Sequence, residues 1–303
     1  MADEEEKNAR PIFVVDAFTD KPFGGNPAAV CLVGSKELSD DVLQKIAKEM
    51  NLSETAFILE KNMIDTYNKG SCFGLRWFTP KCEVALCGHA TLASAAVLFN
   101  SIGNPSTEVT FETLSGNLMA RKQGSSICLN FPLNSCEPLH EEDQTIARLI
   151  KAVVGELGVK EVEYSKTTKK LLLCLEPSLT RDDLENLSPD FQAMMCAHSS
   201  GVVRGVIVTL QGTESNGCVD SSGAVYDFVS RYFAPWVGIP EDPVTGSAHT
   251  VLASFWSSRL KKNDFYARQC SSRGGELKIH VRQDNRVDIA GQAVLVLQGS
   301  LQL

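Results

Sequence analysis

Several features that would assign this chain quickly are missing from its 303 residues. It has no C-x-x-C pair and no G-x-G-x-x-G pattern, which argues against a zinc ribbon and a dinucleotide-binding fold. No apolar stretch reaches the roughly 18 residues that a membrane-spanning helix needs. The N-terminus also lacks a basic segment followed by an apolar one, so we expect no signal peptide and a cytoplasmic protein.

The chain has fewer basic than acidic residues. The chain has 29 Lys and Arg residues against 37 Asp and Glu, a net charge of −8, and no basic cluster. We therefore expect neither a nucleic acid nor a membrane as partner. The clearest charge run, from Asp3 to Glu6, is acidic and typical of a solvated terminus. None of the ten cysteines has a recognised zinc spacing, so no metal site is predicted and the thiols should be free.

What the sequence does contain is a duplication. Three short motifs recur in the same order, with an offset of 155 to 159 residues: 76–80 (RWFTP) with 231–235 (RYFAP), 83–88 (EVALCG) with 241–246 (EDPVTG), and 115–118 (SGNL) with 274–277 (GGEL). A period of this length is the size of a domain and too long for a solenoid repeat. The duplication predicts two similar half-domains, residues 1–124 and 125–292.

Each half has the same coarse plan of short strands around one helix of small and apolar residues. In the first half we expect strands at 12–18, 28–33, 57–59, 75–78, 109–112, 118–122 and 127–131, and helices at 39–51 and 88–99. In the second half we expect strands at 171–175, 203–210, 227–233, 265–269, 277–282, 287–290 and 293–297, and a helix at 246–260. The helix at 39–51 should be capped by the side chain of Ser39.

The helix that begins at Gly88 carries no charged residue until well past Phe99. A helix with no polar face must be surrounded by protein. The predicted fold class is therefore α+β, with two pseudo-symmetric domains, each a curved, mostly antiparallel sheet or barrel wrapped around a central helix.

Both central helices begin at a glycine, Gly88 or Gly246. Free N–H groups and the helix dipole make such a start suitable for binding an anion, although a glycine there can also serve only a tight turn. If the two domains face each other, both helix starts can point into one cleft. His89 follows Gly88 directly, where the helix start favours a neutral imidazole. Asp242 lies in a sharp turn, and its local pattern equally fits an Asx cap.

Four segments together resemble the PhzF-like family, whose members share the diaminopimelate-epimerase fold. They are 13–30 (FVVDAFTDKPFGGNPAAV), 51–58 (NLSETAFI), 76–95 (RWFTPKCEVALCGHATLASA) and 238–249 (GIPEDPVTGSAH). They cover nearly the whole chain in the family's order. The resemblance implies a cofactor-independent isomerase that moves a proton between carbons of a small carboxylated metabolite. It also implies that the last strand, 293–303, returns to the first half-domain.

The resemblance implies a role for each matching residue. The glutamate of the SETAF segment would be the acid/base, although by local sequence alone a glutamate there is usually solvated. The implied catalytic residues are Glu54, His89 and Asp242, and the implied substrate-binding residues are Asn26, Gly88, Gly246 and Ser247. No cofactor is implied.

The epimerase relatives use two cysteines, one on each face of a stereocentre. Here Cys87 stands at the first position and Thr245 at the second. A hydroxyl is too weak an acid to form the opposing base at neutral pH, so a single carboxylate should act alone. Two alternatives stay open: an epimerase that uses Glu54 with another acid, and a protein that binds a partner and keeps an unused pocket. By resemblance, the partners to expect are a second copy of the chain in a homodimer and a WD-repeat protein.

Overall fold

The computed structural model describes residues 9–61, 66–139 and 144–303, so the acidic run from Asp3 to Glu6 lies outside the described residues. The chain forms two compact units. Unit 1 comprises Met1–Asn130 and Ala290–Leu303, and unit 2 comprises Phe131–Ile289. Within the described ranges, no helix has the length and apolar character needed to cross a membrane.

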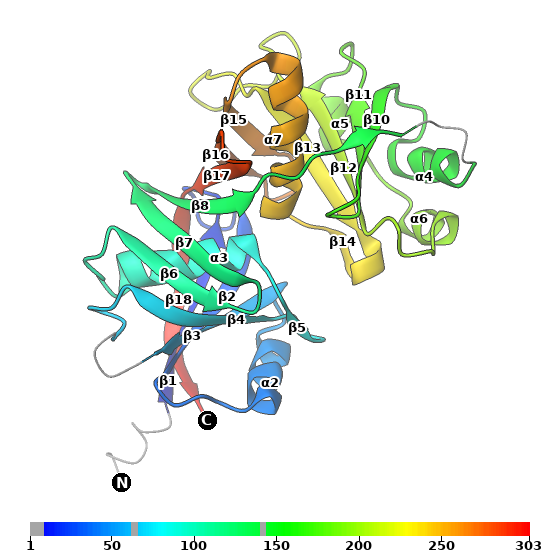
Figure 1. The fold of residues 1–303 in the computed structure, drawn as a ribbon. Helices are drawn as coiled ribbons and strands as arrows, with labels where there is room; N and C mark the ends of the chain where they lie inside the picture. Colours follow the sequence, from blue (N-terminus) through cyan, green and yellow to red (C-terminus); the bar gives the residue numbers. More distant parts are fainter. Residues whose placement is uncertain (1–8, 62–65, 140–143) are drawn as a thin grey trace. The chain divides into compact units, whose positions relative to one another are not determined.

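In its described residues, unit 1 is a mixed, mostly antiparallel sheet with the helices α2 and α3 (Figure 1). Its elements are β1 (Ala9–Ala17), β2 (Asn26–Gly34), α2 (Asp40–Met50), β3 (Glu54–Glu60), β4 (Cys72–Phe78), β5 (Glu83–Val84), α3 (Gly88–Ala96), β6 (Glu108–Thr113), β7 (Gly116–Gln123), the start of β8 (Ser126–Pro132) and β18 (Ala293–Gln302). The strands pair in the order β18–β1–β2–β3–β4–β6–β7–β8, and only the pairs β2–β3 and β4–β6 are parallel.

Helix α3 is the centre of unit 1. All of its residues after Gly88 are buried, and it contacts β1, β2, β3, β7 and β18 (Figure 1). This confirms the prediction of a helix enclosed by a curved sheet. A π-helical turn, Val97–Ser101, continues it.

Unit 2 has the same strand order. Its elements are β9 (Glu137–Pro138), α4 (Gln144–Val154), β10 (Val159–Ser165), β11 (Lys170–Leu175), α5 (Arg181–Glu185), α6 (Phe191–Ala197), β12 (Gly205–Gln211), β13 (Phe228–Ala234), a 3-10 turn (Pro235–Val237), β14 (Ile239–Glu241), α7 (Gly246–Leu260), β15 (Asp264–Gln269), β16 (Gly275–Val281) and β17 (Arg286–Gly291). The strands pair in the order β9–β10–β11–β12–β13–β15–β16, and only β11–β12 and β13–β15 are parallel.

The sheet of unit 2 has a different helix layer on each face. On one face, Leu171 and Leu173 of β11 join an apolar cluster with side chains of α4, α5 and α6. On the other face lies α7, whose Trp256 stacks on Phe228 at 5.8 Å and donates a hydrogen bond from Nε1 to Thr209 Oγ1 at 3.1 Å. Because strand residues alternate between the faces, every second residue of β11 points toward the α7 side.

The duplicated motifs contain an arginine–glutamate ion pair that recurs in both units. Arg76 donates to both carboxylate oxygens of Glu83 at 2.8 and 2.9 Å, and Arg231 does the same to Glu241 at 2.7 and 2.8 Å. Each guanidinium also lies over the phenylalanine two residues further along its strand, at 5.2 and 4.9 Å. The pair holds β4 to β5, or β13 to β14, and so fixes the loop that leads into the central helix.

Two sequence-based predictions need correction. Ser39 is the N-cap residue of α2, but its side chain makes no capping hydrogen bond; instead its carbonyl oxygen accepts from the N–H groups of Val42 and Leu43, both at 3.0 Å. Several elements were also missed: α4, α5, α6, β10 and the two- or three-residue strands β5, β9 and β14. The short strands and α5 are too brief to show a period.

Candidate active site

Glu54 is the first residue of β3, immediately after the turn that ends α2. Asn51 makes that turn, because its left-handed backbone (φ 49°) stops the helix. The parallel ladder then places Glu54 beside Ala28 of β2. The residue is only 9% exposed, whereas a glutamate at a helix–strand junction is usually solvated.

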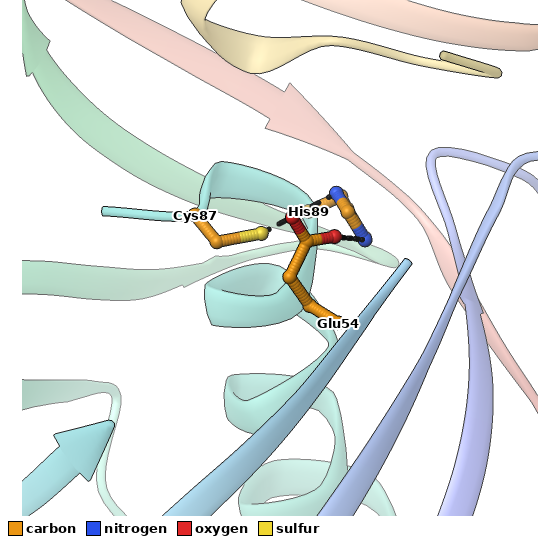
Figure 2. Close-up of side chains that lie close together, drawn as sticks. All are labelled: Glu54, Cys87 and His89. Carbon is orange, nitrogen blue, oxygen red and sulfur yellow. Dashed lines mark hydrogen bonds and ion pairs between the residues drawn. The ribbon is translucent and has the colours of Figure 1, made fainter. Parts of the chain in front are cut away.

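The carboxyl group of Glu54 meets two side chains from the start of α3 (Figure 2). His89 is the second residue of the helix, and its Nε2 lies 3.3 Å from Glu54 Oε2. Cys87 is the N-cap residue, and its Sγ lies 3.5 Å from His89 Nδ1. All three residues are buried, so the cluster is shielded from bulk water.

Two further contacts set the protonation of the imidazole. Asn26 Nδ2 lies 3.2 Å from His89 Nδ1, and Ser53 Oγ lies 3.2 Å from His89 Nε2. With the Asn26 amide in this orientation its N–H donates, so Nδ1 is the acceptor. A neutral imidazole then carries its proton on Nε2, the nitrogen that faces Ser53 and Glu54.

The environment of Glu54 favours its protonated form more than water does. Burial raises the pKa of the carboxyl group above 4.5, and hydrogen bonds with Ser53 and Cys87 offset part of that rise. Within the described part of the chain, Oε2 has no aligned hydrogen-bond donor, although His89 Nε2 is close by. A carboxyl group in this state can both accept and return a proton.

The glycine-rich turn before β2 places Asn26 beside His89. Asp16, which is buried, accepts a hydrogen bond from the N–H of Phe23 at 2.7 Å. Gly25 has φ +59°, and a Cβ there would lie 2.1 Å from the carbonyl oxygen of Ala17. Only glycine therefore fits this position, which explains the DAF and GGNP parts of the motif.

The same three residues, Glu54, Cys87 and His89, also have the donor types of a metal site. Their ligand atoms lie within 4.8 Å of one another. Carboxylate, thiolate and imidazole are all ligands that zinc accepts. Among the residues that the structure describes, this is the one group of its kind, whereas the sequence predicted no metal site at all.

In unit 2 the predicted residues gather at the start of α7. Thr245, the N-cap residue, donates its hydroxyl to Asp242 Oδ2 at 2.5 Å, and its N–H donates to Gln269 Oε1 at 2.8 Å. Gln269 Nε2 donates in turn to the carbonyl oxygen of Asp242. Gly246 is buried and Ser247 is exposed at the first turn. The sequence placed Asp242 in a turn, and its side chain there accepts the hydroxyl of Thr245, at the position where the family motif expects a pocket residue.

The predicted residues therefore form two groups, one in each unit. Asn26, Glu54, Gly88 and His89 belong to unit 1, and Asp242, Gly246 and Ser247 belong to unit 2. That both groups line one cleft stays a prediction.

Sequence reasoning missed the contacts of Ser53, Gln269 and Lys170. Ser53 lies within the SETAF segment that carried the resemblance. Lys170 opens the apolar strand β11, which was predicted to begin one residue later. A charged residue at the start of an apolar run was the signal that could have found it.

His249 is a structural histidine. It is fully buried, its Nδ1 lies 2.8 Å from the carbonyl oxygen of Thr245, and burial lowers its pKa to about 4. It therefore stays neutral at physiological pH and stacks against Phe228 in the core.

Comparison with known proteins gives concordant matches. The family model described as PhzC-PhzF, phenazine biosynthesis-like protein, matches residues 15–299. A phenazine biosynthesis-like domain-containing protein of Bos taurus is 54% identical over 293 residues, which cover 96% of this chain and 98% of that protein. A protein of Pseudomonas aeruginosa named as an uncharacterized isomerase is 42% identical over 293 residues, with the same coverage.

Solved structures agree. A crystal structure of a PhzF-family phenazine biosynthesis protein from Enterococcus faecalis has a TM-score of 0.82 and 37% identity, covering 97% of this chain and all of that chain. A hydroxyproline epimerase from Agrobacterium vitis has a TM-score of 0.55 at 13% identity, over 98% of this chain and 93% of that one, which shows a shared fold alone.

Proposed function

Because the chain belongs to the PhzC-PhzF family of phenazine biosynthesis-like proteins, we propose that it is a cofactor-independent isomerase in which Glu54 moves a proton. The substrate is a small carboxylated metabolite. The observation that carries the proposal is the buried contact between the Glu54 carboxyl group and the His89 imidazole, 3.3 Å apart. At the family level, a 42% identical relative is itself named an isomerase.

The proposed reaction needs one group to take a proton and return it elsewhere. Ionised Glu54 removes a proton from a substrate carbon, and the C–H electron pair forms a new double bond. The electrons of the existing double bond shift to a second carbon, which receives the proton back from Glu54. Substrate and product therefore differ only in the place of one proton and one double bond, and the raised pKa of Glu54 suits both steps.

His89 assists as a hydrogen-bond donor. Its Nε2–H, held by the acceptor role of Nδ1 toward Asn26, can polarise a substrate oxygen while charge develops on the substrate. Ser53 shares this N–H and keeps the ring turned toward the carboxyl group.

The epimerase alternative uses Glu54 with another acid, for which Cys87 is a candidate because it contacts Glu54 and its Sγ is 3.5 Å from His89 Nδ1. Two-base chemistry also needs an acid on the opposite face. The residue at the corresponding helix start of unit 2 is Thr245, whose hydroxyl already donates to Asp242. This favours the single-carboxylate reaction.

The test is a metabolite screen in deuterated water with wild type, Glu54→Gln and Glu49→Gln. Glu49 is exposed on α2 and is the matched control. We expect deuterium uptake into a carboxylated metabolite that falls by about 10²–10⁴-fold in Glu54→Gln and is unchanged in Glu49→Gln. Uptake that is the same in Glu54→Gln would refute the role of Glu54. No uptake into any metabolite would favour a protein that only binds a partner.

A further inference from the structure

Lys170 is a buried lysine at the start of β11, on the same side of the sheet as α7. Leu171 and Leu173 point into the apolar cluster on the opposite face, so alternation along the strand turns Lys170 toward the α7 side. Its neighbour in the parallel ladder is Gly205, the first residue of β12. The lysine therefore lies at one end of the sheet, and its side chain is on the face that α7 covers.

The space around Lys170 is shaped by Tyr232. The Lys170 ammonium lies 5.5 Å from the centre of the Tyr232 ring. The tyrosine hydroxyl occupies the place that a side chain at Gly205 would take, because a Cβ there would lie 2.1 Å from it. Asp242 is next to Tyr232, since its N–H donates to the Tyr232 carbonyl oxygen at 3.1 Å. Lys170 thus sits at the end of the sheet that leads into α7.

Among the residues that the structure describes, no carboxylate contacts this ammonium directly. Lys170 is only 7% exposed, and within the described ranges it makes no hydrogen bond or ion pair through its side chain. Arg231, equally buried at 8%, instead pairs with Glu241 and donates to three carbonyl oxygens. A buried cation without such partners is costly, and groups of this kind cluster at binding sites.

We propose that Lys170 is the anion-binding residue of unit 2 and holds a small carboxylate together with the first turn of α7. The N-cap residue Thr245 makes no side-chain cap, which leaves N–H groups of that turn available to the anion. An ammonium and a helix start suit a carboxylate better than a neutral group.

The protonation of Lys170 is compatible with this role. Burial lowers its pKa to about 8, and the negative charge of Asp242 opposes part of that shift. The side chain is therefore mostly cationic at pH 7, and a bound carboxylate would favour the cation further.

The experiment is a calorimetric titration of the full chain with malonate, and with malonamide as its neutral match. The variants are Lys170→Met, Lys170→Arg and Lys278→Met, where Lys278 is exposed on β16. We expect malonate binding that weakens by about 10- to 100-fold in Lys170→Met, the loss typical of one charged hydrogen bond, and much less in Lys170→Arg. Lys278→Met should match wild type, and malonamide should not bind. Equal malonate affinity in Lys170→Met, or none in wild type, overturns the proposal.

Urea unfolding separates a binding role from a structural one. A lysine kept for a ligand should leave the unfolding midpoint unchanged or higher in Lys170→Met, because an unpaired buried charge is removed. A lower midpoint would instead make Lys170 a structural partner of Asp242. Deuterium uptake is measured separately, so the isomerase proposal can fail while Lys170-dependent malonate binding persists, and the reverse.

Discussion

Units 1 and 2 share one architecture and differ at the positions that carry chemistry. In unit 1 the ladder places Glu54 of β3 beside Ala28 of β2. At the equivalent point of unit 2, Gly205 of β12 lies beside Lys170 of β11. The equivalence follows from the duplicated motif, because the residues after Glu54 and Gly205 each pair with the phenylalanine of RWF or RYF. At this pair of positions, unit 1 thus has a carboxylate on the second strand of the parallel ladder, and unit 2 has an amine on the first.

The helix starts differ in the same way. Cys87 and His89 open α3, whereas Thr245 and Ser247 stand at the same two positions of α7. The arginine–glutamate pair and the helix-start glycine are present in both units. These shared residues are therefore what the fold needs, and the differing ones are where function can reside.

The largest expected effect distinguishes the two arginines. Arg231 is buried and bonded to Glu241 and three carbonyl oxygens, so Arg231→Met should lower the free energy of unfolding by about 3–5 kcal/mol. The side chain of Arg76 is 18% exposed and its partners are all carboxylates near the surface, so Arg76→Met should cost only about 1 kcal/mol. Urea unfolding followed by tryptophan fluorescence measures both.

Equal losses in the two variants would contradict this ranking. Arg76→Lys and Arg231→Lys serve as controls, because lysine keeps the charge but cannot make the two-pronged contact. The lysine variant should recover more of the lost stability at position 76 than at position 231.

A smaller effect is expected at Gly205. The Cβ of Gly205→Ala would lie 2.1 Å from the hydroxyl of Tyr232, so the ring must move, at a cost of about 1–3 kcal/mol in the free energy of unfolding. Gly299→Ala is the matched control, because that glycine of β18 has open space around it. A Gly205→Ala variant as stable as Gly299→Ala would mean that Tyr232 does not occupy this space in solution.

Much of this architecture could be predicted from the sequence, because it depends on local pattern. The uncharged run after Gly88 predicted an enclosed helix, and the RWF and RYF motifs predicted the duplication. The helices α4 and α6 were missed because no helix among the described residues of unit 1 corresponds to α4, and α6 is only seven residues long. The Ser39 cap failed because the backbone of the first turn took its place.

The site could be predicted only in part. The local sequence of Glu54 indicated a solvated residue, and only the family resemblance indicated a pocket. Its burial depends on β2 and α3, which lie far away along the chain. Lys170 was missed for the same reason: its isolation depends on Gly205 and Tyr232, and no local pattern encodes such contacts.

A pH-dependent comparison concerns the ionisation of Glu54. Burial raises the pKa of this carboxyl group in the folded state above the unfolded value of about 4.5. Between those two pKa values the folded state holds more protons, so wild type loses stability as the pH rises through them. Glu54→Gln cannot ionise and should escape this loss.

Below pH 4.5 the free energy of unfolding of Glu54→Gln should match that of wild type. At neutral pH it should be higher than that of wild type, by less than the loss expected for Gly205→Ala. Unfolding in urea at a series of pH values measures it, with Glu49→Gln as the exposed control. A Glu54→Gln variant that is less stable at neutral pH would show that the ionised carboxylate is stabilised in the folded state, which would contradict the raised pKa.

The smallest effect is expected when Cys87, the N-cap residue of α3, is replaced by threonine, the residue at the same position of α7. Cys87→Thr keeps a side chain suited to the extended N-cap backbone (φ −143°, ψ 113°), so the free energy of unfolding should change by less than about 1 kcal/mol. If Glu54 works alone, deuterium uptake should fall by less than about tenfold, a change of about 1.4 kcal/mol in the barrier. Cys87→Ser, which keeps a donor without the extra methyl group, should match it. A loss near that of Glu54→Gln in both variants would make the thiol a second acid, because a hydroxyl cannot replace it in proton transfer at neutral pH. The reaction would then be an epimerisation that uses Glu54 and Cys87, both of unit 1. The difference between Cys87 and Thr245 would then be the difference in sequence that gives unit 1 its second acid.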